Sequence, residues 1–177
     1  MFVLGIDPGL SRCGFGGVAE EHGEQLPVAA GVITSDPALA VPDRLAALHR
    51  ELEALVGELD PDVVAVERVF FQTNARTAMA VGQASGVALL VAAEHGCRVV
   101  EYTSNEVKLA VAGYGSADKT QVQQMVARLL RLARVPDPPD VADALALALC
   151  HLAARRYEDL VRSARGEGSP GPREARR

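Results

Sequence analysis

Tryptophan is absent from this sequence and cysteine is scarce. The 177 residues include three cysteines, Cys13, Cys97 and Cys150, which are far apart and set among apolar neighbours. An odd number of cysteines at these spacings indicates neither a disulfide framework nor a paired-cysteine metal site. We interpret all three as thiols of a hydrophobic core.

Long hydrophobic runs and targeting signals are also missing. No apolar run approaches the roughly 18 residues that a membrane helix needs, and no N-terminal stretch combines a basic region, an apolar run and a cleavage site. We therefore expect a cytoplasmic protein. With 49% hydrophobic residues, the chain is long enough for one domain with a full core and too short for two.

A surplus of positive charge is lacking too, and the charge is unevenly spread. The formal net charge is −5, yet residues 155–177 carry seven Arg against four acidic residues, which leaves eleven basic and nineteen acidic residues in 1–154. Residues 1–154 are too acidic to bind DNA through their net charge. Binding a polyanion requires metal cations, local basic patches or a dimer that pools them.

Hydrophobic patterning predicts an ordered series of strands and helices. Three apolar segments near the N-terminus predict an antiparallel meander, leucines at helical spacing predict the next helix, and a continuous apolar run ending in Glu67 predicts a buried strand. The expected strands are 2–6, 14–18, 28–33, 62–67 and 97–102, and the expected helices are 42–59, 75–94, 104–112, 118–133 and 140–157. We place one domain at 1–157 and a basic, disordered tail at 158–177.

The stretch FVLGIDPGL puts a lone carboxylate, Asp7, at the end of the first apolar strand. Asp, Pro and Gly form turns, so Asp7 can simply hold a hairpin turn. The other interpretation is that the carboxylate is needed at the edge of the sheet, and that Gly9 lets the backbone turn away without blocking it. The remaining motifs decide between the two.

Four blocks of the sequence carry a resemblance to a known family. They are GIDPGLSRCGFG, VVAVERVFFQTNARTAMAVGQASG, VKLAVAGYGSADKTQVQQMV and PPDVADALALALCH. In their order and approximate spacing they resemble the RuvC family of bacterial Holliday junction resolvases, over about residues 1–155. The resemblance implies an α/β fold, an RNase H-like mixed five-stranded sheet flanked by helices.

The resemblance also implies an active site of four carboxylates, Asp7, Glu67, Asp140 and Asp143. In an RNase H-like sheet the first and fourth strands are neighbours, so Asp7 and Glu67 are expected a few ångströms apart. Asp140 and Asp143 follow a Pro-Pro pair, which puts both on one face of the first turn of the last helix. Each acid alone can be a turn or helix cap, but together they favour a metal site. Carboxylate oxygens favour Mg²⁺, with Mn²⁺ as a substitute, and two ions balance four carboxylates.

The family's activity is the paired, symmetric hydrolysis of DNA phosphodiester bonds in recombination and repair, leaving 5′-phosphate and 3′-hydroxyl ends. Because a four-way junction must be cut at two symmetric points, the resemblance implies a homodimer, and it implies the RuvA-RuvB branch-migration complex as a partner. Small residues at 75–88 suit a close helix contact in such a dimer. Ser85 stands where some family members have a basic residue, so the contact made by that basic residue is not expected in this chain.

Five residues besides the carboxylates are candidate DNA contacts: Phe70, Phe71, Arg76, Lys108 and Lys119. One of the two Phe can belong to the core, while the other suits stacking on an unpaired base at the crossover, and the resemblance assigns this position to Phe70. Lys108 and Lys119 are the only lysines beside sixteen Arg. Both are near helix starts and coincide with basic positions that the resemblance assigns to DNA contact.

Two other functions stay open at this point. One is a junction-binding module without catalysis. The other is an actin-like or sugar-kinase ATPase, whose first phosphate loop also follows a strand with Asp-x-Gly. That fold needs a second such domain and a Gly-rich adenosine loop, and 177 residues contain neither. Metal-dependent nicking of a four-way junction separates the nuclease from the binding module, and a nucleotide-dependent shift in melting temperature identifies an ATPase.

Overall fold

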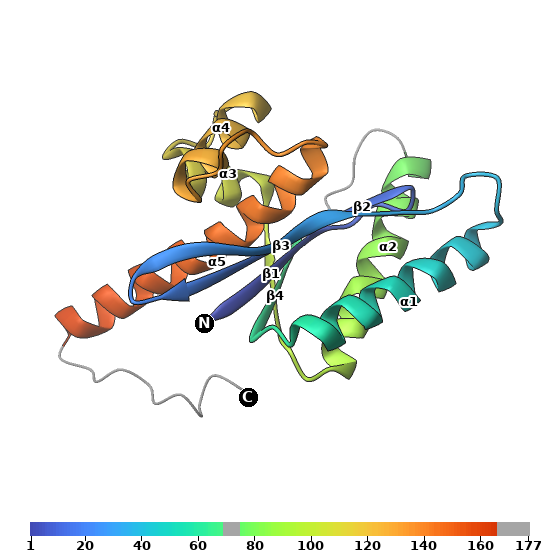
Figure 1. Cartoon of the computed structure of the whole chain (residues 1–177), viewed down its shortest axis with the longest axis horizontal. Helices are drawn as coiled ribbons and strands as arrows, with labels where there is room; N and C mark the ends of the chain where they lie inside the picture. Colours follow the sequence, from blue (N-terminus) through green and yellow to red (C-terminus); the bar gives the residue numbers. More distant parts are fainter. Residues whose placement is uncertain (69–74, 166–177) are drawn as a thin grey trace.

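A mixed five-stranded sheet forms the centre of the molecule (Figure 1). The computed structural model describes residues 1–68 and 75–165. The sheet has the order β3-β2-β1-β4-β5. β1, β2 and β3 form the expected antiparallel meander; β4 pairs in parallel with β1, and β5 pairs in parallel with β4. The strands are β1 (Phe2–Asp7), β2 (Arg12–Glu21), β3 (Glu24–Thr34), β4 (Val63–Glu67) and β5 (Arg98–Tyr102).

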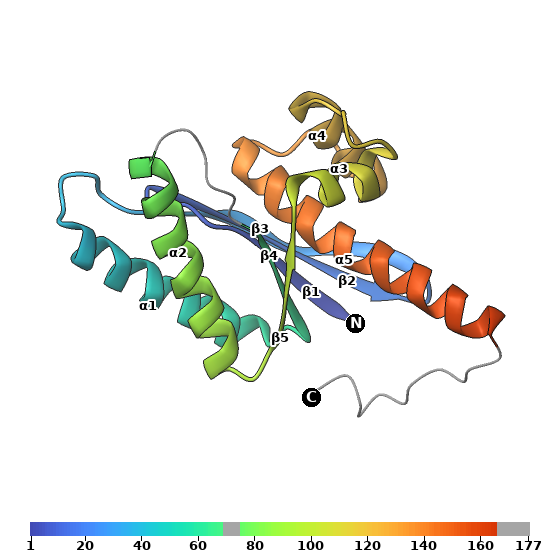
Figure 2. The same cartoon turned by 180° about the vertical axis from the view of Figure 1, so that it is seen from behind.

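Helices cover both faces of this sheet. In Figures 1 and 2, α1 and α2 lie on one side of the sheet, and α5 lies on the other together with α3 and α4. The bounds are α1 (Val41–Leu59), α2 (Ala75–Glu94), α3 (Ser104–Ala112), α4 (Lys119–Leu129) and α5 (Pro139–Ala164). This arrangement confirms the expected RNase H-like α/β fold and separates the hydrophobic core into two layers.

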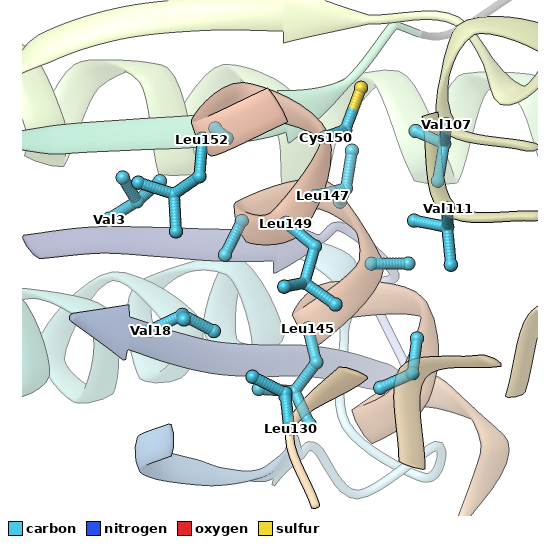
Figure 3. Packing of buried hydrophobic residues seen from close by; sticks show 14 of the residues in the cluster. Val3, Val18, Val107, Val111, Leu130, Leu145, Leu147, Leu149, Cys150 and Leu152 are labelled. Atoms are coloured by element: carbon cyan, nitrogen blue, oxygen red, sulfur yellow. The ribbon is translucent and has the colours of Figure 1, made fainter. Parts of the chain in front are cut away.

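The long helix α5 organises the layer that contains the candidate site. Figure 3 shows Leu145 and Leu149 of this helix packed among side chains of β1 and β2, and fully buried aliphatic side chains of this kind provide most of the folding free energy. Glycines on the sheet allow a backbone-to-backbone approach. A Cβ atom at Gly5 would overlap the carbonyl oxygen of Ala144, and one at Gly14 would overlap that of Asp140. The start of α5 is thereby held against the ends of β1 and β2.

Several elements are longer than the patterning predicts. β2 and β3 extend into a polar hairpin, because Glu20 and Glu21 pair with Gln25 and Glu24 although they carry no hydrophobic signal. α5 continues past residue 157 to Ala164, so residues 158–164 are helical. α4 ends at Leu129, earlier than the expected residue 133. Of the cysteines, Cys13 and Cys150 are buried as expected, whereas Cys97 is half-buried.

α2 differs from the expectation that no stretch is apolar and long enough for a membrane helix. Within the described residues, Thr77–Glu94 is one stretch of 18 residues with mean hydropathy 1.3 that passes this test by length and composition. Such a match is weak evidence, because core helices of water-soluble proteins pass the same test. Only 28% of the stretch is buried inside the molecule, so α2 presents apolar surface to its surroundings.

Candidate active site

The pleat of the sheet directs two carboxylates toward α5. β1 and β4 are parallel neighbours with Ile6 opposite Val66, so the next residues, Asp7 and Glu67, reach the same edge of the sheet. Successive side chains on a strand alternate between faces. Ile6 and Val66 belong to the core layer under α1 and α2, and Asp7 and Glu67 therefore face the opposite layer, where α5 begins. The predicted juxtaposition of strands one and four is confirmed.

The first turns of α5 bring the other two carboxylates to this edge. Asp143 contributes to the wall of a pocket of about 390 Å³, together with Asp7 and Glu67. The other lining residues come from α3, α4 and α5: Ser104, Val107, Lys108, Lys119, Val122, Ala146 and Leu147. Asp140 does not line this pocket. Its carboxylate Oδ2 lies 2.8 Å from Nη2 of Arg12, at the start of β2.

Burial and mutual repulsion raise the free energy of the ionised carboxylates in this site. The pKa of Asp7 is raised from 3.8 to about 7, first by burial and then by the charges of Glu67, Asp143 and Asp140. Burial also raises the pKa of Glu67, with a further contribution from Asp143. A perturbed carboxylate pair in a cleft is typical of a functional site.

Two capped helices place lysines against this acidic group. Lys119 is the first residue of α4, directly after the N-cap Asp118, and its Nζ lies 2.6 Å from Oδ2 of Asp143. This hydrogen bond raises the pKa of Lys119. Lys108, on α3, lines the same pocket, and both lysines act to lower the pKa of Glu67. The structure therefore brings both predicted lysines to the carboxylates.

The other residues singled out in the sequence lie away from this pocket or outside the described residues. Phe70 and Phe71 lie outside the described residues, and Arg76 belongs to the first turn of α2. Ser85 is buried in α2. The DNA-binding roles of Phe70, Phe71 and Arg76 stay predictions.

Sequence reasoning missed Arg12 and the contact between Tyr102 and His151. Arg12 was present in the first motif, five residues after Asp7, and the antiparallel turn between β1 and β2 is what returns it to the same edge. The hydroxyl of Tyr102 is hydrogen-bonded to Nδ1 of His151 at 2.8 Å. This bond joins the end of β5, the strand beside Glu67, to α5. No local pattern indicates such a pair, because its members are 49 residues apart.

Comparison with known proteins identifies the family. The family profile described as crossover junction endodeoxyribonuclease RuvC matches residues 3–151. The chain belongs to the RuvC family. A RuvC protein of Salinispora arenicola is 56% identical over 153 residues, covering 86% of this chain and 87% of that protein. One of Alkaliphilus oremlandii is 47% identical over 162 residues, covering 92% and 99%.

Solved structures agree with this assignment. Thermus thermophilus RuvC superposes with a TM-score of 0.83 at 36% identity, covering 89% of this chain and 97% of that one. A second structure, of T. thermophilus RuvC in complex with Holliday junction substrate, gives a TM-score of 0.84 at 36% identity, covering 89% and 96%. The yeast mitochondrial Holliday junction resolvase Ydc2, at 13% identity and a TM-score of 0.60, supports the fold alone. RuvC-family membership makes the chain a nuclease and decides against the ATPase interpretation.

The RuvC family implies a divalent metal ion, and the donor set fits one. Asp7 and Glu67 are buried carboxylates with raised pKa values, and a bound cation relieves both the burial and the repulsion. Hard oxygen donors suit Mg²⁺ or Mn²⁺. As arranged, however, residues 1–68 and 75–165 contain no group of three or more His, Cys, Asp or Glu side chains that could hold a metal ion. Asp143 and Asp140 are paired with Lys119 and Arg12 instead.

Proposed function

We propose that this chain resolves Holliday junctions as a homodimer, with one metal-dependent nuclease site in each subunit. The observation that carries the proposal is the pocket at the sheet edge, where Asp7, Glu67 and Asp143 meet Lys108 and Lys119. Carboxylates with adjacent lysines suit phosphodiester hydrolysis, in which metal ligands and phosphate-binding cations must lie side by side. The relative that was solved with a Holliday junction supports this substrate.

The four carboxylates hold the metal in this proposal. Asp7 and Glu67 provide ligands from the rigid sheet, and Asp143 and Asp140 provide ligands from α5 once their cation partners move away. Two Mg²⁺ ions, for which Mn²⁺ substitutes, supply an activated water and charge stabilisation for the leaving 3′ oxygen. The products carry 5′-phosphate and 3′-hydroxyl ends, which a ligase can seal.

The lysines bind and orient the DNA backbone. Lys119 is fixed at the start of α4 by the capping box of Asp118 and Gln121, in which each side chain accepts a hydrogen bond from the other residue's backbone N–H. Its ammonium group leaves Asp143 and pairs with a phosphate oxygen when DNA and metal bind. Lys108 contacts the same strand from α3. Phe70 or Phe71 stacks on an unpaired base at the crossover.

The exposed face of α2 provides the dimer contact. Gly82 and Gly86 have open space where a Cβ atom would lie, while Met79 and Leu90 expose apolar side chains on the same helix. Ala84 and Ala88 point instead into the core. A two-fold helix contact at the two glycines would cover this surface and supply the second active site. The RuvA-RuvB complex is the partner, and the reaction takes place in the cytoplasm.

Cleavage of a synthetic four-way junction tests the proposal. Asp7→Asn, Glu67→Gln and Asp140→Asn are each expected to abolish Mg²⁺-dependent nicking while junction binding stays intact or becomes tighter, because each removes a ligand and one negative charge. Asp143→Asn is expected to retain at most partial activity. Glu101→Gln is the matched control, since Glu101 is an exposed carboxylate one strand away from Glu67. Substantial cutting by any of the first three variants contradicts the assignment.

A further inference from the structure

We propose that Arg12 binds a phosphate of the DNA strand on the side of the carboxylates opposite to Lys108 and Lys119. This inference rests on the proposed junction-resolving function and adds a residue to its DNA-binding surface. Across the sheet edge, the order of strands places Arg12 on β2, then Asp7 on β1 and Glu67 on β4. The two lysines line the pocket with Asp7, Glu67 and Asp143, whereas Arg12 lies outside that lining and pairs with Asp140.

A strand that crosses this edge needs a cation on both sides. The carboxylates repel phosphate, and the body of the chain is acidic overall. Lys108 and Lys119 offset this repulsion only on the side of α3 and α4. Arg12 is a cation that the structure brings to the β2 side, where it lies against Asp140.

The guanidinium of Arg12 keeps donors free for a second partner. Its Nη2 donates one hydrogen bond to Oδ2 of Asp140 at 2.8 Å, and a guanidinium has five N–H groups. The Arg12 side chain is 49% exposed, against 25% for Asp140. An arginine held on one edge by a carboxylate can present its other edge to a phosphate, for which its planar fork is well suited.

The backbone on both sides of Arg12 is fixed in position by neighbouring contacts. Arg44 donates hydrogen bonds from Nη2 to the hydroxyl of Ser11 at 2.7 Å and from Nε to that of Ser35 at 2.9 Å. The backbone N–H of Ser35 also donates to the carbonyl of Ser11 at 3.3 Å. On the other side, Gly14 lies in direct backbone contact with Asp140. The backbone at Arg12 is thus preorganised, which reduces the conformational entropy lost when the residue binds a phosphate.

The salt dependence of junction binding in EDTA tests this role without catalysis. Each phosphate contact contributes about 0.9 to the slope of log affinity against log salt concentration. Arg12→Gln is expected to lower the magnitude of this slope by about 0.9. The variant's loss of affinity relative to wild type should therefore be about threefold larger at roughly 50 mM salt than at roughly 200 mM. Arg156→Gln is the matched control, because Arg156 pairs with Glu20 near the other end of α5 with similar side-chain exposures of 54% and 20%.

Release of Arg12 from its carboxylate gives a second readout. Asp140→Asn is expected to tighten junction binding in the wild-type background and to have a smaller effect when combined with Arg12→Gln, because the gain depends on the freed guanidinium. Equal gains in both backgrounds contradict the proposal. So does an Arg12→Gln slope equal to that of wild type.

Two controls keep the outcomes distinct. Wild-type preference for a four-way junction over linear duplex is measured first. Its absence overturns the proposed function and this inference together, whereas preference with an unchanged Arg12→Gln slope overturns this inference alone. If thermal unfolding shows that Arg12→Gln is misfolded, Arg12→Lys becomes the test. It is expected to weaken binding severalfold through loss of the planar fork, and wild-type affinity contradicts the proposal.

Discussion

Replacing Asp7 by Asn should stabilise the metal-free protein even though we expect the same change to abolish cleavage. In the folded state the pKa of Asp7 is about 7, against 3.8 without the folded environment. Between these values the unfolded chain is ionised while the folded chain stays protonated, so the free energy of unfolding falls as pH rises. Above about pH 7 the penalty is complete, and at about 1.4 kcal/mol per pH unit it amounts to about 4 kcal/mol.

Asn has nearly the same shape and no charge, so the variant escapes this penalty. For a chain of this length 1 kcal/mol corresponds to roughly 2–4 °C in melting temperature. At about pH 8 in EDTA we therefore expect Asp7→Asn to melt roughly 10 °C above wild type. The difference should shrink as pH is lowered and disappear below about pH 3.8, where wild-type Asp7 becomes protonated in both states.

Thermal unfolding by circular dichroism, in EDTA and in saturating Mg²⁺, is the assay. Mg²⁺ should raise the melting temperature of wild type more than that of Asp7→Asn, because binding to the folded state relieves the repulsion only where the carboxylate is present. Asp159→Asn serves as a control, since Asp159 is an exposed partner of Arg155 on α5. An Asp7→Asn protein that melts below wild type at about pH 8 in EDTA refutes the reasoning.

Three further predictions concern neighbouring features. Lys119→Arg should slow single-turnover cleavage roughly tenfold although it preserves charge, because the planar guanidinium cannot replace a compact ammonium beside a metal. Lys108→Arg should slow cleavage less. Wild-type cleavage rates for both variants would show that the positive charge alone suffices. Gly14→Ala should lower the free energy of unfolding by at least about 2 kcal/mol, measured by urea denaturation, because its Cβ overlaps the Asp140 backbone. Burial lowers the pKa of His151 from 6.5 to about 4. Between these values the unfolded chain binds a proton that the folded chain does not, so the free energy of unfolding should fall by about 3 kcal/mol as pH drops from about 6.5 to about 4. A His151→Phe variant should lack that dependence in pH-resolved thermal unfolding.

The order of strands and helices could be predicted because it depends on short-range patterns in the sequence. Apolar runs, helical leucine spacing and turn residues are short-range signals. The polar hairpin between Glu20 and Gln25 lacked such a signal, since its strands extend by backbone pairing alone. The last turns of α5 were missed for a similar reason: beyond Leu152 the helix is largely exposed and carries charged residues that also suit a tail.

The candidate site was predictable in its residues and not in its pairings. Asp7, Glu67 and Asp143 meet as expected, because strand ends and the start of α5 are fixed by the topology. Spacing alone put Asp140 beside Asp143, but Asp140 turns to Arg12, a residue 128 positions away. Such long-range ion pairs depend on the close approach of β2 and α5, which no short stretch of sequence reveals.

Cleavage of a four-way junction with all four strands separately labelled tests the central claim most directly. In Mg²⁺, wild type should nick two symmetry-related strands and leave 5′-phosphate and 3′-hydroxyl ends that a ligase seals, while Asp7→Asn binds the junction and leaves it intact. Equal cutting of linear duplex, or cutting by Asp7→Asn at the wild-type rate, would contradict the account.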